Sequence, residues 1–335
     1  MSKTVSVLLP NYNHAHYIGE AIEAFLSQSF KPLEIVVIDD ASTDDSLKVI
    51  EAFRKKNPII RVVRNEKNMG PVACNNRELP TLSGDYVHLA AADDKVLPGL
   101  FEQSLRLLSR YPKAGFCSSL GRLMDQNGKD LGPYNTPIIS DEECYLSPER
   151  INSIHKKFGE WVVPNTVVFR RGAILEFGGF DLELGPSADG FLHCALALKH
   201  GACFIPRPLG LWRETLTGYA ASHAPDFRAS MDLLERLEDR MRGKHRDVFP
   251  PEYADLFKRR ALRAMVYGLS RRNPYRHDHI LEAGRAMPVP GVLDRAYFAG
   301  MRLYLEVGRW ATKIYVFLQH PLREQARIIL GKLRS

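Results

Sequence analysis

Two pairs of adjacent aspartates are the residues of this sequence best placed to do chemistry. Asp39 and Asp40 end the apolar run LEIVVIDD, and Asp93 and Asp94 end the run GDYVHLAAADD. Neighbouring carboxylates raise each other's pKa unless a cation lies beside them. Mg²⁺ and Mn²⁺ commonly take one or two protein carboxylates and complete their shell with water and substrate phosphates. The pairs therefore predict a metal site for a phosphorylated substrate, with a helix N-cap as the structural alternative for the second pair.

The apolar runs that end in these aspartates have the length and composition of buried strands, and amphipathic patterns lie between them. Strands that alternate with helices predict βαβ units and a mainly parallel sheet. In an open sheet of this kind ligands bind outside the carboxyl ends of the strands, where both aspartate pairs and Tyr12 fall. The predicted strands cover residues 5–10, 33–40, 59–65 and 84–94, and the predicted helices lie within residues 11–30 and 46–56.

The pattern changes in the rest of the chain. Residues 132–160 are polar and rich in loop-forming residues, whereas residues from about 226 onward follow a helical pattern, with Met231 and Leu234 on one face. The sequence therefore predicts an α/β domain over residues 1–225 and a helical region over residues 226–335. Further strands are predicted at 114–125, 162–171 and 202–214, and a further helix at 190–201.

Charge is distributed unevenly along the 335 residues. The formal net charge is +7, and residues 226–335 hold 22 Lys and Arg against 13 Asp and Glu, so the positive charge belongs to this C-terminal part. Such a segment is typical of contact with an anionic partner, and a solvated helical face is the alternative. Five scattered cysteines without CxxC spacing argue against a disulfide framework and a zinc site and suit a reducing cytoplasm. The N-terminus shows no signal-peptide pattern.

The motifs resemble those of a known family. The opening VSVLLPNYNHAHYIGEAIEAFLSQSFKPLEIVVIDDASTDDS, the later NEKNMGPVACNN and the run GDYVHLAAADD follow one another in the order and spacing of family 2 glycosyltransferases with the GT-A fold. The resemblance covers about residues 4–215. It implies a Rossmann-like, mainly parallel sheet flanked by helices, which is followed here by a C-terminal helical extension. It also implies inverting transfer of a sugar from a nucleotide-diphosphate sugar, for which we favour a UDP-sugar.

The resemblance assigns nucleotide contacts to the first part of the chain. Pro10 and Tyr12 match the loop that lines the base pocket, where an aromatic ring can stack on the base. Asp40 matches the residue that accepts a hydrogen bond from the base, and Asp39 lies beside it. Asn68 matches a loop near the nucleotide and is equally well explained as a turn residue.

The second aspartate pair matches the DxD-type metal motif of the family. Asp94 is the expected metal ligand, with Asp93 beside the metal and the nucleotide, and Mn²⁺ or Mg²⁺ would stabilise the leaving diphosphate as a Lewis acid. Many relatives also carry an aromatic-Arg-x-His stretch. This chain keeps Trp212 and Arg213 but has Thr215 in place of the histidine, and Arg213 is expected to pair with a phosphate.

An inverting transferase needs a base that removes the proton of the acceptor hydroxyl. In the family an Asp or Glu at the start of a helix serves, and Asp189 in FGGFDLELGPSADGFLHC fits this description. A helix N-cap is its structural alternative. Asp181 and Glu183 are weaker candidates that would shape the acceptor loop. His193 and His223 are alternatives for the missing metal or diphosphate ligand.

The basic C-terminal region contains an amphipathic segment at residues 296–320. Arg302, Glu306, Arg309 and Lys313 form one charged stripe on a helix, and four charges argue against a membrane span. The apolar face is expected to pack against the catalytic domain or a second subunit, or to enter an anionic membrane interface. The location expected from these features is cytoplasmic, with peripheral attachment to the inner face of the membrane as a further option.

The resulting hypothesis is a metal-dependent inverting glycosyltransferase. It would extend a saccharide or lipid-linked acceptor in surface polysaccharide or lipopolysaccharide synthesis, one sugar at a time, because the chain lacks the Gln-x-x-Arg-Trp motif of processive synthases. A nucleotidyltransferase acting on sugar phosphates is the first alternative, but the loop NYNHAHYIGE has no Lys or Arg for a triphosphate. A non-catalytic binding or scaffold protein is the second. No nucleic-acid motif is present, so no nucleic-acid partner is expected.

Overall fold

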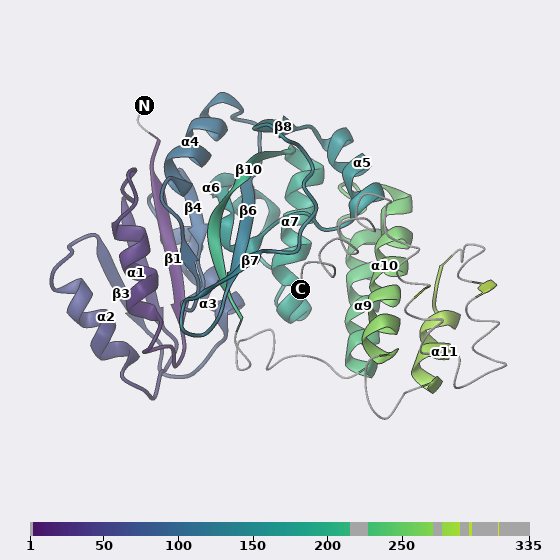
Figure 1. Ribbon diagram of the computed structural model, residues 1–335, viewed down its shortest axis with the longest axis horizontal. Coiled ribbons are helices and arrows are strands. Elements are labelled where there is room, and N and C mark those ends of the chain that lie inside the picture. Colours follow the sequence, from purple (N-terminus) through teal and green to yellow (C-terminus); the bar gives the residue numbers. More distant parts are fainter. Residues whose placement is uncertain (1–2, 215–226, 271–276, 289–294, 297–313, 315–335) are drawn as a thin grey trace. The chain divides into compact units, whose positions relative to one another are not determined.

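The computed structural model describes residues 3–214, 227–270, 277–288, 295–296 and 314 (Figure 1). The chain divides into two compact units. The first contains residues 1–153 and 160–224, and the second contains residues 154–159 and 225–335.

A mixed β-sheet forms the centre of the first unit (Figure 1). The described strands follow the order β3-β2-β1-β4-β9-β6-β10-β5, with β7 paired to β6 and β8 paired to β10. Strands β1 to β4 pair in parallel, as the sequence predicts, whereas β9 lies antiparallel between β4 and β6. The strands are β1 (Val5–Asn11), β2 (Glu34–Asp39), β3 (Ile60–Arg64), β4 (Tyr86–Leu89), β5 (Lys95–Val96), β6 (Phe116–Met124), β7 (Asp130–Pro133), β8 (Cys144–Leu146), β9 (Val168–Arg170) and β10 (Ala202–Arg213).

Helices cover both faces of the sheet. Residues of α1, α2 and α4 share one hydrophobic core with Val5, Val7 and Leu9 of β1. Side chains alternate along a strand, so Leu8, which is also buried, faces the opposite layer. The helices are α1 (Ile18–Leu26), α2 (Ser46–Arg54), α3 (Pro71–Glu78), α4 (Leu100–Arg110), α5 (Pro148–Phe158), α6 (Arg171–Phe177) and α7 (Ala188–His200), and the 3₁₀ turns are η1 (Leu79–Thr81), η2 (Pro164–Thr166) and η3 (Leu182–Ser187).

Strand direction brings distant segments to one edge of the sheet. Strands β1, β2 and β4 run in parallel, and β6 has the same direction as β4 because both are antiparallel to β9. β10 runs parallel to β6. The carboxyl ends of these strands therefore lie at the same edge, which we call the carboxyl edge. The loops that follow β1, β2 and β4 and the last residue of β10 all lie there.

Two segments differ from the sequence-based expectation. Residues 132–160 are not simply loop, because they contain β8 and helix α5. The signal for α5 was present, since Ile151, Ile154 and Phe158 recur at helical spacing after Pro148. The strand expected at residues 162–171 is reduced to β9, preceded by the turn η2.

The second unit is helical in its described part. It contains α9 (Phe227–Arg242), α10 (Pro251–Ser270) and α11 (His277–Arg285), and Leu234, Leu262 and Ile280 lie in their shared core. The part of α5 that belongs to this unit bonds to α10, because the Tyr253 hydroxyl and His155 Nδ1 lie 2.8 Å apart. The expected amphipathic segment at residues 296–320 lies outside the described residues, apart from Ile314.

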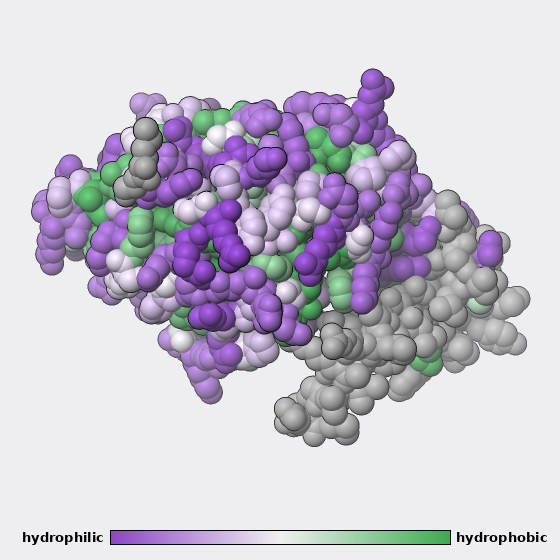
Figure 2. Space-filling model, turned by 90° about the horizontal axis from the view of Figure 1, so that it is seen from above, coloured by the Kyte–Doolittle hydropathy of each residue, from purple (hydrophilic) through white to green (hydrophobic). Residues whose placement is uncertain are grey.

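The described surface is mostly polar. Hydrophilic side chains cover most of the coloured surface in the space-filling view, and hydrophobic side chains lie between them in small groups (Figure 2). Among the described residues, no helix combines the length and the apolar character that crossing a membrane requires.

A Leu→Ala substitution made once in the core and once at the surface tests how much buried packing contributes to stability. Leu8→Ala in the buried centre of β1 should lower the free energy of unfolding by about 2–5 kcal/mol, because it leaves a cavity. Leu33→Ala, where the side chain is 46% exposed, should change it by no more than about 0.5 kcal/mol. Urea denaturation followed by circular dichroism measures both, and equal effects would contradict the described packing.

Candidate active site

The predicted nucleotide residues lie on or directly beyond the carboxyl edge. Pro10 is the penultimate residue of β1, opposite Ile38 of β2, and the Tyr12 side chain is 42% exposed. The loops after β1 and β2 are bonded together, because Thr43 N donates to Asn13 Oδ1 at 2.7 Å. Tyr12 is thus presented to solvent from a loop whose backbone is fixed by its neighbour.

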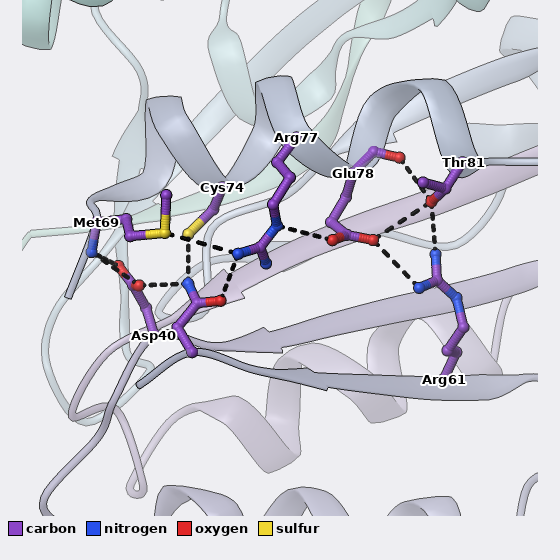
Figure 3. A network of polar contacts seen from close by, with 8 residues as sticks. Asp40, Arg61, Met69, Cys74, Arg77, Glu78 and Thr81 are labelled. Carbon is purple, nitrogen blue, oxygen red and sulfur yellow. Dashed lines mark hydrogen bonds and ion pairs between the residues drawn. The ribbon is translucent and has the colours of Figure 1, made fainter. Parts of the chain in front are cut away.

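Asp40 is a buried acceptor that organises the loop after β3 (Figure 3). Its carboxylate accepts hydrogen bonds from Met69 N at 2.9 Å, from Gly70 N at 2.8 Å and from Asn65 Nδ2 at 2.6 Å. Gly70 adopts a φ of 80°, a conformation that favours glycine, at the end of this loop. Asp40 therefore fixes the chain at residues 65–70, and its contact with a nucleotide base stays a prediction.

The Asp40 network continues along α3. Arg77 Nη1 donates to Asn65 Oδ1 at 2.7 Å, and Arg77 Nε donates to Glu78 Oε1 at 2.9 Å. Arg61 of β3 donates to Glu78 Oε2 at 3.1 Å and to Thr81 Oγ1 at 2.8 Å (Figure 3). These bonds hold α3 against the edge strand.

Asp39 and Asn68 have different surroundings from Asp40. Asp39 is fully buried, and both of its carboxylate oxygens lack a hydrogen-bond donor among the described residues. A carboxylate in this condition is costly, so Asp39 is the less satisfied member of the pair. Asn68 is exposed, and its Oδ1 accepts a hydrogen bond from Gly70 N at 3.0 Å, which is the turn geometry that the sequence also allows.

Asp93 and Asp94 follow β4 in a tight turn of the chain. Asp94 is buried, and its Oδ1 accepts a hydrogen bond from Arg213 N at 2.8 Å. Burial, followed by the negative charge of Asp93, raises the pKa of Asp94 well above its usual range, although Arg213 opposes this effect. A cation at this turn would relieve both contributions.

The chemistry of this pair suits a hard divalent ion. Carboxylate oxygens are the ligands that Mg²⁺ and Mn²⁺ prefer, and such an ion often takes few of them from the protein. Among the described residues, no group of three or more His, Cys, Asp or Glu side chains is placed to hold a metal by itself. Water and the phosphates of a substrate commonly supply the remaining ligands of such an ion.

Arg213, the last residue of β10, connects the aspartate turn to two other segments. Its side chain is only 1% exposed. Nε donates to Asp93 O at 2.7 Å, and Nη1 donates to Asp125 O at 3.2 Å and Gln126 O at 3.0 Å. Nη2 donates to Glu20 Oε2 at 2.8 Å. Protein acceptors therefore occupy most of the donors that we expected to meet a phosphate, and the phosphate contact stays a prediction.

Glu20, which pairs with Arg213, also pairs with Lys95. Lys95 Nζ lies 2.7 Å from Glu20 Oε2. The hydrogen bond from Lys95 is the largest influence on the pKa of Glu20, and with a further contribution from Arg213 it holds this pKa below its usual range, although burial opposes the change. The Arg213 guanidinium also lies over the Tyr17 ring, 4.4 Å from its centroid. Position 215 and His223 lie outside the described residues.

Asp189 lies in the first turn of α7, as the sequence predicts. Its Oδ1 accepts a hydrogen bond from Gly190 N at 2.7 Å, and the amino end of the helix favours its negative charge. Asp181 instead caps η3, where its Oδ1 accepts a hydrogen bond from Glu183 N at 3.0 Å. Asp181 therefore shapes the loop that leads to α7.

Tyr134 lies within electrostatic range of both Asp94 and Asp189. Burial raises the pKa of Tyr134, and the negative charges of Glu160, Asp189 and Asp94 raise it further. Sequence reasoning missed both Tyr134 and Glu160, because they lie in the segment that reads as a polar loop. No spacing within that segment links them to residues 94 and 189.

His193, the second alternative for the missing ligand, is a core residue. It is 2% exposed, and its ring lies 5.5 Å from the Phe169 ring and 5.9 Å from the Phe116 ring. Burial lowers the pKa of His193 to about 4, although the Asp189 charge opposes this change. The contacts of His193 with Phe116 of β6 and Phe169 of β9 pack α7 against the sheet, and this packing fixes the position of Asp189.

Residues 6–169 match the family described as Glycosyl transferase family 2. An uncharacterized protein of Mycobacterium tuberculosis is 28% identical over 220 residues, which are 63% of this chain and 67% of that protein. The glycosyltransferase GlyG of Streptococcus pneumoniae is 32% identical over 30% of this chain, and the putative teichuronic acid biosynthesis glycosyltransferase TuaG of Bacillus subtilis is 32% identical over 39%. The latter two matches span 34% and 51% of those proteins. The resemblance that the motifs predict is confirmed.

Solved structures share the fold. Residues 1–349 of S. aureus TarS in complex with UDP-GlcNAc align with a TM-score of 0.68 at 18% identity, over 93% of this chain and 91% of that chain. The mannosyltransferase PcManGT from Pyrobaculum calidifontis in complex with GDP-Man and Mn²⁺ aligns with a TM-score of 0.55 at 20% identity, over 94% and 85%. The predicted GT-A fold is therefore confirmed.

The role of Arg213 can be tested with a conservative change. Arg213→Lys should lower the free energy of unfolding by about 3 kcal/mol, because one ammonium group cannot replace the guanidinium at several buried acceptors. Arg54→Lys, in the exposed Arg54–Glu51 pair, should change it by less than about 0.5 kcal/mol. If urea denaturation gives the two variants the same stability, Arg213 does not join the segments described above.

The buried His193 predicts a pH dependence of stability. Its pKa is lowered on folding from about 6.5 to about 4, so the unfolded chain takes up this proton first as the pH falls. The stability that comes from a neutral His193 is fully present above pH 6.5. As the pH falls from 6.5 towards 4, the free energy of unfolding decreases by at most about 1.4 kcal/mol per pH unit. His193→Phe removes this loss, so its stability should fall less than that of the wild type between pH 7 and pH 5. Parallel curves in urea denaturation would contradict this prediction.

Proposed function

We propose that this chain, whose residues 6–169 are a family 2 glycosyltransferase region, transfers a sugar from a nucleotide-diphosphate sugar to a hydroxyl group with inversion at the anomeric carbon. The observation that carries the proposal is the placement of Asp93 and Asp94 on the carboxyl edge, where Asp94 lies within electrostatic range of the same tyrosine as Asp189. One acidic group can thus serve the leaving diphosphate and another the attacking hydroxyl. Structural neighbours in complex with UDP-GlcNAc and GDP-Man support a nucleotide-sugar donor.

The residues of this chain divide the work between donor and acceptor. Tyr12 and the loop fixed by Asp40 would bind the nucleotide, and Asp93 and Asp94 would hold Mn²⁺ or Mg²⁺. When bound, the ion would supply positive charge that stabilises the leaving diphosphate. Asp189 would accept the proton of the acceptor hydroxyl as that oxygen attacks. Asp189 lies in the first turn of α7, where the amino end of the helix favours a negative charge.

The proposal names a class of donor and a class of acceptor. A UDP-sugar is the favoured donor, and the acceptor is proposed to be a saccharide or a lipid-linked glycan of a surface polysaccharide. The relative TuaG, which is named for teichuronic acid biosynthesis, supports that kind of product. The basic charge of residues 226–335 supports attachment to an anionic membrane surface on the cytoplasmic side, and self-association remains a further proposal.

Donor binding tests the class of reaction. A thermal-shift screen of UDP-, GDP- and dTDP-sugars with Mn²⁺ should identify a donor that raises the melting temperature. At a hundredfold excess over Kd, a ligand adds about 2.7 kcal/mol to the free energy of unfolding. Addition of EDTA should abolish the shift. A shift that persists in EDTA would exclude the proposed metal, and no shift with any donor would exclude the proposed reaction.

The proposed base can be separated from its neighbours. Asp189→Asn keeps the size of the side chain but removes the proton acceptor, so it should lower kcat for transfer by about 10²–10⁴-fold and leave the donor-induced thermal shift intact. Asp181→Asn is the matched control, and it should retain transfer within a few fold. Loss of transfer in the control with normal turnover of Asp189→Asn would assign the base elsewhere.

A further inference from the structure

An aromatic pair lies close to the proposed base. The ring centroids of Trp212 and Tyr134 are 5.5 Å apart, and their planes are inclined by 43°. Trp212 is the penultimate residue of β10, and Tyr134 directly follows β7. Both side chains are half-buried, so part of each ring is available to a ligand.

The backbone fixes both rings. Tyr134 N donates to Gly121 O at 2.9 Å, and Trp212 lies opposite Leu123 of β6. A side chain at position 121 would come within 2.7 Å of Val163 Cγ1 and 3.6 Å of Tyr134 Cβ, so the glycine permits this close packing. The backbone at both positions is therefore held by β6, Trp212 within the sheet and Tyr134 directly beyond β7.

Glu160 adds a carboxyl group beside the first turn of α7. Its Oε2 lies 3.7 Å from the point where a Cβ of residue 190 would be. Among the described residues, no hydrogen bond or ion pair engages this carboxyl. Neighbouring protein groups that limit its hydration, together with the charge of Asp189, raise the pKa of Glu160 above its usual range, although the residue is exposed. Within the described part of the chain, an unpaired carboxyl group thus lies next to the proposed base.

We propose that Trp212, Tyr134 and Glu160 form the subsite that binds an uncharged pyranose ring of the acceptor beside Asp189. The inference rests on the proposed glycosyl transfer and specifies the acceptor. A pyranose has one face of C–H groups, which packs on aromatic rings, and hydroxyl groups, which donate to a carboxylate. A few polar groups beside an apolar surface are typical of small-molecule sites.

Charge decides between the ligands that such a site could take. The carboxyl groups of Glu160, Asp189 and Asp94 all act on Tyr134, and the charge of Asp189 already disfavours a second negative charge at Glu160, so the subsite disfavours anions. A phosphate or a uronic acid would be repelled there, and the diphosphate of the donor has a separate place at residues 93–94 if a metal is bound. A neutral sugar is not repelled, so the terminal sugar of the acceptor should be uncharged.

The subsite can be tested without knowing the natural acceptor. Saturation-transfer NMR would be recorded with the full-length protein and the methyl β-pyranosides of glucose, galactose and N-acetylglucosamine, with methyl β-glucuronide as the charged counterpart. At least one neutral pyranoside should receive saturation and the glucuronide should not. Trp212→Ala and Glu160→Gln should each reduce the signal of the neutral sugar at least threefold. Tyr111→Phe and Glu142→Gln, an aromatic and a carboxylate change elsewhere, should not.

Kinetics with the donor found by thermal shift give a second measurement. Glu160→Gln should raise KM for the neutral pyranoside about tenfold, a loss typical of one hydrogen bond to a charged group, and should raise KM for the donor much less. The proposal is overturned if no neutral pyranoside binds the wild-type protein, or if both variants bind it as the controls do. Absence of any donor turnover would refute the proposed function instead, because the NMR measurement does not depend on turnover.

Discussion

The buried guanidinium group of Arg213 joins segments that no local interaction would bring together. It bonds to the turn after β4 through Asp93 O, to the turn after β6 through Asp125 O and to helix α1 through Glu20. A planar cation with several fixed donors suits this place, because each buried carbonyl needs a donor and the nearby carboxylates need positive charge. The aspartate turn is therefore held by the end of β10, about 120 residues further along the chain.

The two halves of the site differ in how many hydrogen bonds their carboxyl groups accept. On the side of β2, Asp40 is satisfied by backbone N–H groups and Asn65, so it serves as a structural acceptor as well as a candidate nucleotide contact. On the side of α7, few donors among the described residues meet Asp189 and Glu160, and limited hydration and the charge of Asp189 raise the pKa of Glu160. Saturated acceptors hold the loops, and unsaturated ones remain for substrates and cations.

The position of Asp189 depends on packing rather than on polar bonds. The N-cap residue of α7, Ser187, makes no capping hydrogen bond with its side chain. The position of α7 therefore depends on the packing of the helix face that contains His193. That ring is stacked on Phe169 with an interplanar angle of 16° and contacts Phe116 of β6. A histidine in this environment acts as an aromatic residue, because its charged form would be poorly hydrated.

Local pattern in the sequence was enough to predict the parallel strands β1 to β4, the helices α1 and α2 between the first three of them, and the gathering of Asp39, Asp40, Asp93 and Asp94 at the carboxyl ends of β2 and β4. These features follow from side-chain periodicity and from the direction of strands in βαβ units, which are properties of short segments. Tertiary structure alone decided that β9 lies antiparallel within the sheet, that Arg213 holds the aspartate turn, and that Tyr134 and Glu160 come beside Asp189. The physical reason is that these contacts join residues far apart in the chain, where pairing is selected by the packing and charge of the whole unit and leaves no periodic signal in the sequence.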